Sequence, residues 1–290
     1  MTKQDWDQFT VSPFGEDTPT TRETYDNFLE FRRVVDQLPK PELRKRGWLD
    51  DQNEYSSLLP IFNEIHGAGA RLFRRRDDAS DALCIAWTAF VRAQAKQVAL
   101  AIEVPKFRGI DAVFLEEIAK LSPNEGAIKR LPEILAEQGI ILIYERALPS
   151  MKMDGVVFKL KTGQPVIGHS FRFPRLDNFW FTLMHELAHV VLHSDTLDQP
   201  IYEDLEGDRN DQKELEADRL AKKSFVKRSL WRNCEPRYKR GHEAVERFAH
   251  KVGIHPAIIA GLLSKEENNY QAYSGIVNKV DVRKLAFEND

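Results

Sequence analysis

The chain has 290 residues, of which 42% are hydrophobic, and a formal net charge of −3. This length and apolar content suffice for a buried core in one large or two small globular domains. The near-neutral charge removes a global electrostatic basis for nucleic-acid binding. The apolar runs are too short for a membrane span, and the first residues do not resemble a signal peptide, so we expect a cytoplasmic protein with no membrane partner.

The two cysteines, Cys84 and Cys234, lie far apart in the sequence and neither has a CxxC partner. Neither a disulfide framework nor a thiolate zinc site is therefore predicted. A metal site in this chain would have to use histidine and carboxylate ligands.

The N-terminal part of the chain shows helical signals only. Residues 1–50 are expected to be an arm or linker with one helix at 21–38, which Pro39 and Pro41 interrupt. Residues 51–125 carry apolar side chains at helical spacing and predict a helical subdomain.

Strand signals begin in the middle of the chain. A helix at 128–137 leads into a short apolar segment at 140–144, which is predicted to be a buried strand. Residues 156–160 and 165–171 flank a Thr-Gly turn and predict a hairpin. The second strand of this hairpin is a candidate for pairing with an extended peptide.

The next helix carries the residues with the clearest chemistry. It is expected to run over 179–193, with Asp177 or Asn178 as its cap. It contains His185, Glu186 and His189 in the pattern HExxH. Histidines four residues apart lie on one face of a helix and can bind one ion, which for this donor type is zinc.

Glu186 would lie beside that zinc ion, where a carboxylate can take a proton from water and pass it to a leaving amine. The residues around the HExxH pattern are apolar, so this helix is predicted to be buried. Two unliganded histidines and a glutamate would be costly there. The pattern therefore indicates peptide-bond hydrolysis by a zinc enzyme, with Glu186 as catalytic base.

A third ligand is expected from a second helix that begins near residue 212 and continues toward Trp231. Glu214 and Asp218 are one turn apart there, so one can bind zinc while the other accepts a hydrogen bond from a ligand histidine. Glu216 points to another side of that helix and is expected to be solvated. Three acidic residues of the preceding loop are less suited, because a loop supports a ligand poorly: Glu203, Glu206 and Asp208.

The segments 177–193 and 214–221 resemble the two signature helices of the ImmA/IrrE family of zinc metallopeptidases. The resemblance implies that His185, His189 and Glu214 bind zinc. Asp218 stands where the family has Asn or Asp. Members of this family are mostly regulators that cut or inactivate helix-turn-helix repressors in stress responses, phage defence or toxin–antitoxin control.

Many longer relatives carry a helix-turn-helix at their own N-terminus, but residues 1–50 show no such signature. The resemblance therefore implies a separately encoded repressor or antitoxin as the protein partner. A zinc-bearing module that sequesters a repressor or toxin without cutting it is the alternative function. Glu186 favours the protease, because binding alone needs no base beside the metal.

A second stretch bears on nucleic-acid binding. Residues 248–259 have the residue spacing of a helix-turn-helix, yet the helix after Pro256 lacks the polar side chains that read base edges. We interpret 244–263 as two packed helices separated by Gly253, so direct nucleic-acid binding has little support.

Some polar residues stay without an assigned catalytic role. His193 extends the histidine ladder by one more turn, but three residues at this spacing cannot all reach one zinc ion, so a supporting role is expected. Arg172, Arg175 and Tyr202 could donate to an oxyanion or to the substrate backbone, or form surface ion pairs.

Together these elements predict an α+β fold, with a small antiparallel or mixed sheet packed on the HExxH helix and helical subdomains at both ends. The expected order is an arm at 1–50, a helical subdomain at 51–125, a zinc metallopeptidase core at 126–223 and a C-terminal helical region at 224–290.

Overall fold

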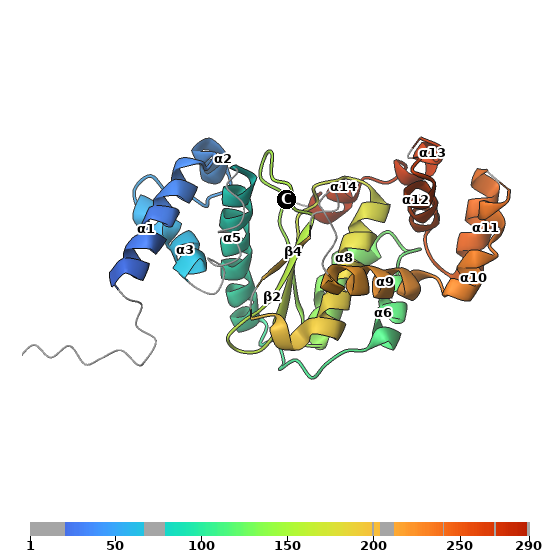
Figure 1. The fold of residues 1–290 in the computed structure, drawn as a ribbon, viewed down its shortest axis with the longest axis horizontal. Helices are drawn as coiled ribbons and strands as arrows, with labels where there is room; N and C mark the ends of the chain where they lie inside the picture. Colours follow the sequence, from blue (N-terminus) through green and yellow to red (C-terminus); the bar gives the residue numbers. More distant parts are fainter. Residues whose placement is uncertain are drawn as a thin grey trace, which may run out of the picture.

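A four-stranded sheet lies at the centre of the fold (Figure 1). The computed structural model describes residues 21–66, 79–198, 200–203, 212–239, 241–269 and 271–288. Within these ranges, helices precede the sheet, follow it and interrupt it, which confirms the predicted α+β class. No described helix combines the length and apolar character that crossing a bilayer requires.

The sheet is mixed, with the strand order β1-β3-β2-β4. Strand β1 (Ile141–Tyr144) pairs parallel with β3 (Pro165–His169), and β2 (Gly155–Lys159) pairs antiparallel with both β3 and β4 (Ile201–Glu203). The predicted hairpin is therefore β2–β3. Strand β3 lies between two partners, so the prediction that it pairs with an added peptide is wrong. Strand β4 is the outermost strand on the other side of β2.

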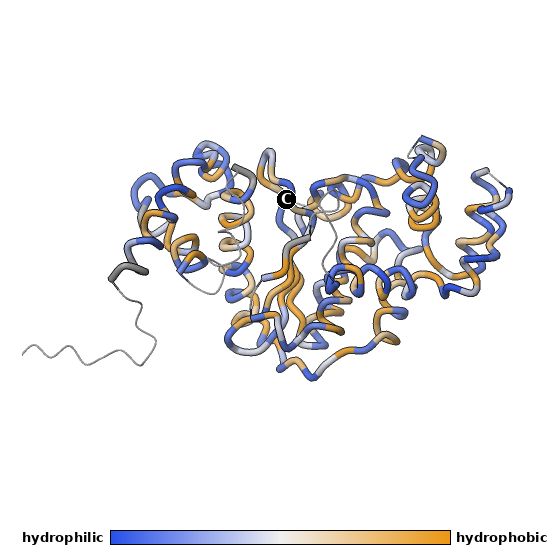
Figure 2. The backbone as a smooth tube through the Cα atoms, viewed as in Figure 1, coloured by the Kyte–Doolittle hydropathy of each residue, from blue (hydrophilic) through white to orange (hydrophobic). Residues whose placement is uncertain are grey.

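The two faces of the sheet belong to different cores, as the alternation of side chains along a strand requires. Ile141 and Ile143 of β1 face the N-terminal helices, whereas Leu142 between them faces the C-terminal helices. Val156 and Val157 of β2 divide in the same way. Figure 2 shows the apolar strands between the two helical layers.

The N-terminal layer contains four described helices: α1 (Thr21–Asp36), α2 (Lys40–Lys45), α3 (Glu54–Glu64) and α5 (Ala79–Ala101). Helix α5 packs on β1 and β3. The segment expected to be an arm contributes Val34, Leu43 and Trp48 to this core. Pro41 lies in the first turn of α2, where its missing N–H costs nothing, so it starts a helix instead of only ending one.

The other layer is built around α8 (Leu176–His193), which packs across β2 and β3 and is the predicted HExxH helix. Four helices of this layer contact it or the sheet: α6 (Ala112–Ala119), α7 (Ala127–Glu137), α9 (Gln212–Phe225) and α12 (Pro256–Glu267). The short helix η3 (Ser194–Thr196) follows α8 directly. Four shorter elements lie in the C-terminal region: α10 (Arg228–Arg232), η4 (Glu235–Arg237), α13 (Ser274–Val277) and α14 (Val282–Phe287). Helix α11 (His242–Val252) precedes α12, and Gly253 lies between the two.

The start of α8 and the end of α9 differ from the predicted boundaries. Helix α8 begins at Leu176, with Arg175 at the N-cap position and no side-chain cap, because Asp177 instead forms an ion pair with the Arg175 guanidinium. Helix α9 ends at Phe225 and does not continue toward Trp231. The chain turns there, and this turn places both Phe225 and Val226 in the core.

Candidate metal centre

Helix α8 carries the HExxH residues on a face that is removed from solvent. His185 is 2% exposed, and Glu186 and His189 are fully buried. The apolar residues around the pattern place the helix in the core, as predicted, since Leu183, Leu187 and others pack into the C-terminal layer. The buried polar groups therefore need partners within the protein.

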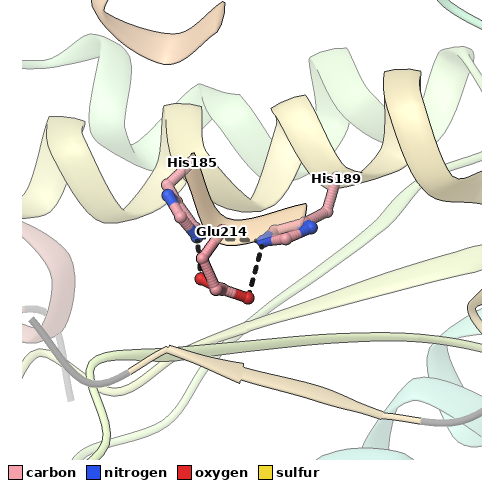
Figure 3. Close-up of side chains that lie close together, drawn as sticks. All are labelled: His185, His189 and Glu214. Carbon is pink, nitrogen blue, oxygen red and sulfur yellow. Dashed lines mark hydrogen bonds and ion pairs between the residues drawn. The ribbon is translucent and has the colours of Figure 1, made fainter. Parts of the chain in front are cut away.

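Helix α9 packs along α8 and supplies one of these partners. The Glu214 carboxylate lies 3.0 Å from His185 Nε2 and 3.4 Å from His189 Nε2. The two Nε2 atoms are 2.9 Å apart. Figure 3 shows both imidazoles turned toward the carboxylate from the same side of α8. The structure thus brings together the three residues that the sequence analysis named as ligands.

Asp218 lies one turn further along α9 and faces the outer nitrogen of His185. His185 Nδ1 is 3.0 Å from Asp218 Oδ1, which is hydrogen-bonding distance. When this nitrogen donates its proton to Asp218, Nε2 of the same ring presents a lone pair to the centre. Lys265 of α12 lies 3.9 Å from the other oxygen of Asp218.

The outer nitrogen of His189 faces a different partner. Its Nδ1 lies 3.0 Å from Nδ1 of His193, the last residue of α8. His193 Nε2 in turn lies 3.5 Å from Glu216 Oε2. The expectation that Glu216 is simply solvated therefore omits this contact, which only the packing of α9 against α8 reveals.

The position of Glu186 is set by the sheet. A Cβ atom on Gly155, the first residue of β2, would overlap the Glu186 carboxylate and would also come within 2.8 Å of Thr182 Cγ2. The carboxylate therefore lies close against the backbone of β2, and any side chain at residue 155 would displace it. Gly155 is opposite Glu203 of β4, so β4 runs beside this end of the site.

The electrostatics of the centre keep Glu214 charged. Burial by itself would raise the pKa of Glu214. When the inner nitrogens of His185 and His189 carry protons, their hydrogen bonds to the carboxylate outweigh burial and lower this pKa to about 2. Burial lowers the pKa of His189 below its ordinary value, although Glu214 opposes this shift. Neutral imidazole and ionised carboxylate are the forms in which these groups bind a metal ion.

The three residues fit a bound cation. One donor atom from each of His185, His189 and Glu214 lies within 4.8 Å of the others, and two imidazoles with one carboxylate form a donor set that suits a divalent metal. Asp218 can accept the Nδ1 proton of His185. In neutral rings protonated at Nδ1, the Nε2 atoms of His185 and His189 are acceptors that face each other and Glu214. A cation placed between them would satisfy all three.

The other candidate residues are not part of this cluster. Arg172 forms an ion pair with Asp154 at 3.4 Å, and Arg175 pairs with Asp177 at the start of α8. Tyr202 and Glu203 belong to β4 through their backbones, whereas Glu206 and Asp208 lie outside the described residues. Sequence reasoning missed Gly155, for which the only signal was an Asp-Gly pair before a strand.

Comparison with known protein families agrees with this geometry. Residues 136–261 match the family described as Peptidase_M78, IrrE N-terminal-like domain. The matched region runs from the end of α7 into α12 and contains the whole histidine and glutamate cluster. The match confirms the resemblance to the ImmA/IrrE family and gives this part of the chain a domain of metallopeptidase type. A search of curated proteins found no match to the sequence.

Proposed function

We propose that the chain is a zinc-dependent metalloendopeptidase that cleaves a specific protein regulator. The observation that carries the proposal is the convergence of His185, His189 and Glu214, with Glu186 next to the first histidine on the same helix. The Peptidase_M78 match supports the class of reaction. We take zinc as the metal because two histidines and one carboxylate on HExxH-type helices suit it.

Zinc in a site with three protein ligands supplies Lewis acidity and makes water in its open position more acidic. The remaining chemistry belongs to Glu186. Its carboxylate would accept a proton from the attacking water and deliver it to the amine nitrogen of the leaving group. Burial of Glu186 and its contact with the backbone of Gly155 hold the carboxylate in one place, which such a transfer requires.

The sheet offers a way to hold an extended substrate. Among the residues that the structure describes, β4 is the outermost strand next to the site, and in Figure 3 it is the strand with grey ends below Glu214. Its partner β2 begins at Gly155, against Glu186. An extended peptide that added to β4 would therefore pass close to the catalytic carboxylate.

We further propose that the regulator is a separately encoded helix-turn-helix repressor or antitoxin, in a stress, phage-defence or toxin–antitoxin setting. The support is the resemblance of the α8 and α9 segments to the ImmA/IrrE family, together with the family match. Cleavage of a transcription regulator also implies that the chain works in the cytoplasm.

The test has two parts. Elemental analysis of the purified chain should find close to one zinc ion per molecule. The zinc-loaded chain should then cut the proposed helix-turn-helix regulator, which mass spectrometry would detect as two fragments. Zinc binding and regulator binding without fragments would instead favour the sequestering module.

A further inference from the structure

His193 lies at the C-terminal end of α8 and turns its ring toward His189. The ring centroids are 5.1 Å apart, and the two Nδ1 atoms are 3.0 Å apart. His193 is only 9% exposed. It faces the outer nitrogen of His189, on the side away from Glu214, so it is not placed as a fourth ligand.

Only one proton fits between the two Nδ1 atoms. If His189 binds a metal ion through Nε2, the neutral ring must carry its proton on Nδ1 and donate it to His193. Nδ1 of His193 must then be the acceptor. A neutral His193 carries its own proton on Nε2, which points toward Glu216 Oε2 at 3.5 Å.

Further hydrogen bonds hold the backbone of His193 and the carboxylate of Glu216. Thr196 Oγ1 donates to the carbonyl oxygen of His193 at 3.1 Å, and Lys213 Nζ donates to the same hydroxyl at 3.1 Å. Gln212 Nε2 donates to the other oxygen of Glu216 at 2.6 Å. Gln212 and Lys213 of the first turn of α9 therefore hold the Glu216 carboxylate and, through Thr196, the backbone at the end of α8.

We infer that His193 is a positioning residue for His189, selecting the tautomer and ring orientation that present Nε2 to the metal, and that Glu216 supports it from α9. This inference rests on the proposed function, in which the ion is zinc. It gives the second histidine ligand a partner that corresponds to Asp218 at the first. Outer partners of this kind commonly change metal affinity by about 10–100-fold when they are removed.

The test measures zinc affinity, by competition between the full-length metal-free chain and a fluorescent chelator. His193→Leu introduces an apolar side chain of similar size that accepts no hydrogen bond, and it should weaken zinc binding by about 10–100-fold. His193→Asn can place an amide oxygen near the position of Nδ1, so it should recover most of the affinity. Leu192→Ala, at a half-exposed neighbour in the same helical turn, is the control and should leave affinity unchanged.

A second comparison uses Glu216→Gln, which should weaken zinc binding when His193 is present. It should have no effect in the His193→Asn background, where the linking Nε2 is absent. The comparison of Glu216→Gln in these two backgrounds tests the inference even if His193→Leu does not fold. Circular dichroism would show whether that variant folds. Wild-type affinity in a folded His193→Leu, or equal effects of Glu216→Gln in both backgrounds, would overturn the inference. Absence of zinc binding by the wild-type chain would instead overturn the proposed function.

Discussion

The carboxylate of Glu186 lies so close to Gly155 that a methyl group on this glycine would overlap one of its oxygens. This contact links the HExxH helix to β2, and through β2 to the edge strand β4. The absence of a side chain at residue 155 is therefore part of the site.

Gly155→Ala should displace Glu186 while leaving the zinc ligands in place. Cleavage should fall toward the level of a protease that lacks its general base, about 10²–10⁴-fold lower, with zinc retained. Single-turnover cleavage and elemental analysis measure the two quantities. Gly126→Ala is a matched control, because this glycine has an ordinary φ of −66° at the start of α7 and meets only the Asn124 side chain. Full activity in Gly155→Ala would show that Glu186 does not need this contact.

The ligand assignment predicts which variants lose metal. His185→Ala, His189→Ala and Glu214→Ala should each abolish tight zinc binding, because three protein ligands are the minimum of such a site. Glu216→Ala should still bind one zinc ion per chain at saturating metal, since its carboxylate lies beyond His193. Loss of zinc in Glu216→Ala with retention in Glu214→Ala would contradict the assignment.

Much of this centre could be predicted because helical spacing is a local property. The i, i+4 rule places His185 and His189 on one face whatever surrounds the helix, and the same rule pairs Glu214 with Asp218. The contact between His193 and Glu216 depends on how α9 is rotated against α8, which no single-helix pattern contains. The contact of Gly155 with Glu186 likewise joins residues 31 apart, on different elements.

The errors in element boundaries have similar causes. Asp177 is a good capping residue by type, but Arg175 is close enough to pair with it, and the helix starts earlier. The sequence makes β3 a candidate for pairing with an extended peptide, but β1, which precedes the hairpin, already pairs with β3 in parallel. Strand order depends on tertiary packing, so local sequence patterns do not predict it.

Acid should destabilise the fold through His169, which lies in β3 among the rings of Tyr144, Phe171 and Phe179. Burial lowers the pKa of His169 to about 3, from an ordinary value of 6.5. Between these values the unfolded chain binds a proton that the folded chain does not. Stability is therefore retained above about pH 6.5 and is lost as the pH falls toward 3, by up to about 1.4 kcal/mol per pH unit.

Urea unfolding in excess EDTA, at several pH values below 6.5, tests this without a contribution from metal release. His169→Asn keeps an acceptor for the Phe171 N–H. It should reduce the slope of the free energy of unfolding against pH by the equivalent of about one proton. Tyr144→Phe removes a hydroxyl in the same cluster and should lower stability while keeping the wild-type slope. Identical slopes in wild type and His169→Asn would refute the assignment to His169.

A protease dedicated to one regulator should be selective through contacts beyond β4, because backbone pairing with β4 alone would accept any extended chain. Casein should be cut poorly, because unfolded proteins in general lack the contacts that align one peptide bond. Short peptides spanning the cleavage site should lose turnover as well as affinity, since contacts far from the cut position the bond. Cleavage rates for the regulator, its short peptide and casein give the comparison, and rapid unselective digestion of casein would point to a housekeeping peptidase.

The most direct measurement co-expresses the chain with a candidate helix-turn-helix regulator of the proposed kind and determines intact masses of both proteins. The wild-type chain should convert the regulator into two fragments from a single cut. Glu186→Gln should leave the regulator intact while carrying the same amount of zinc, because it removes only the base. Undiminished cleavage by Glu186→Gln, or an intact regulator bound to the zinc-loaded wild-type chain, would contradict the account.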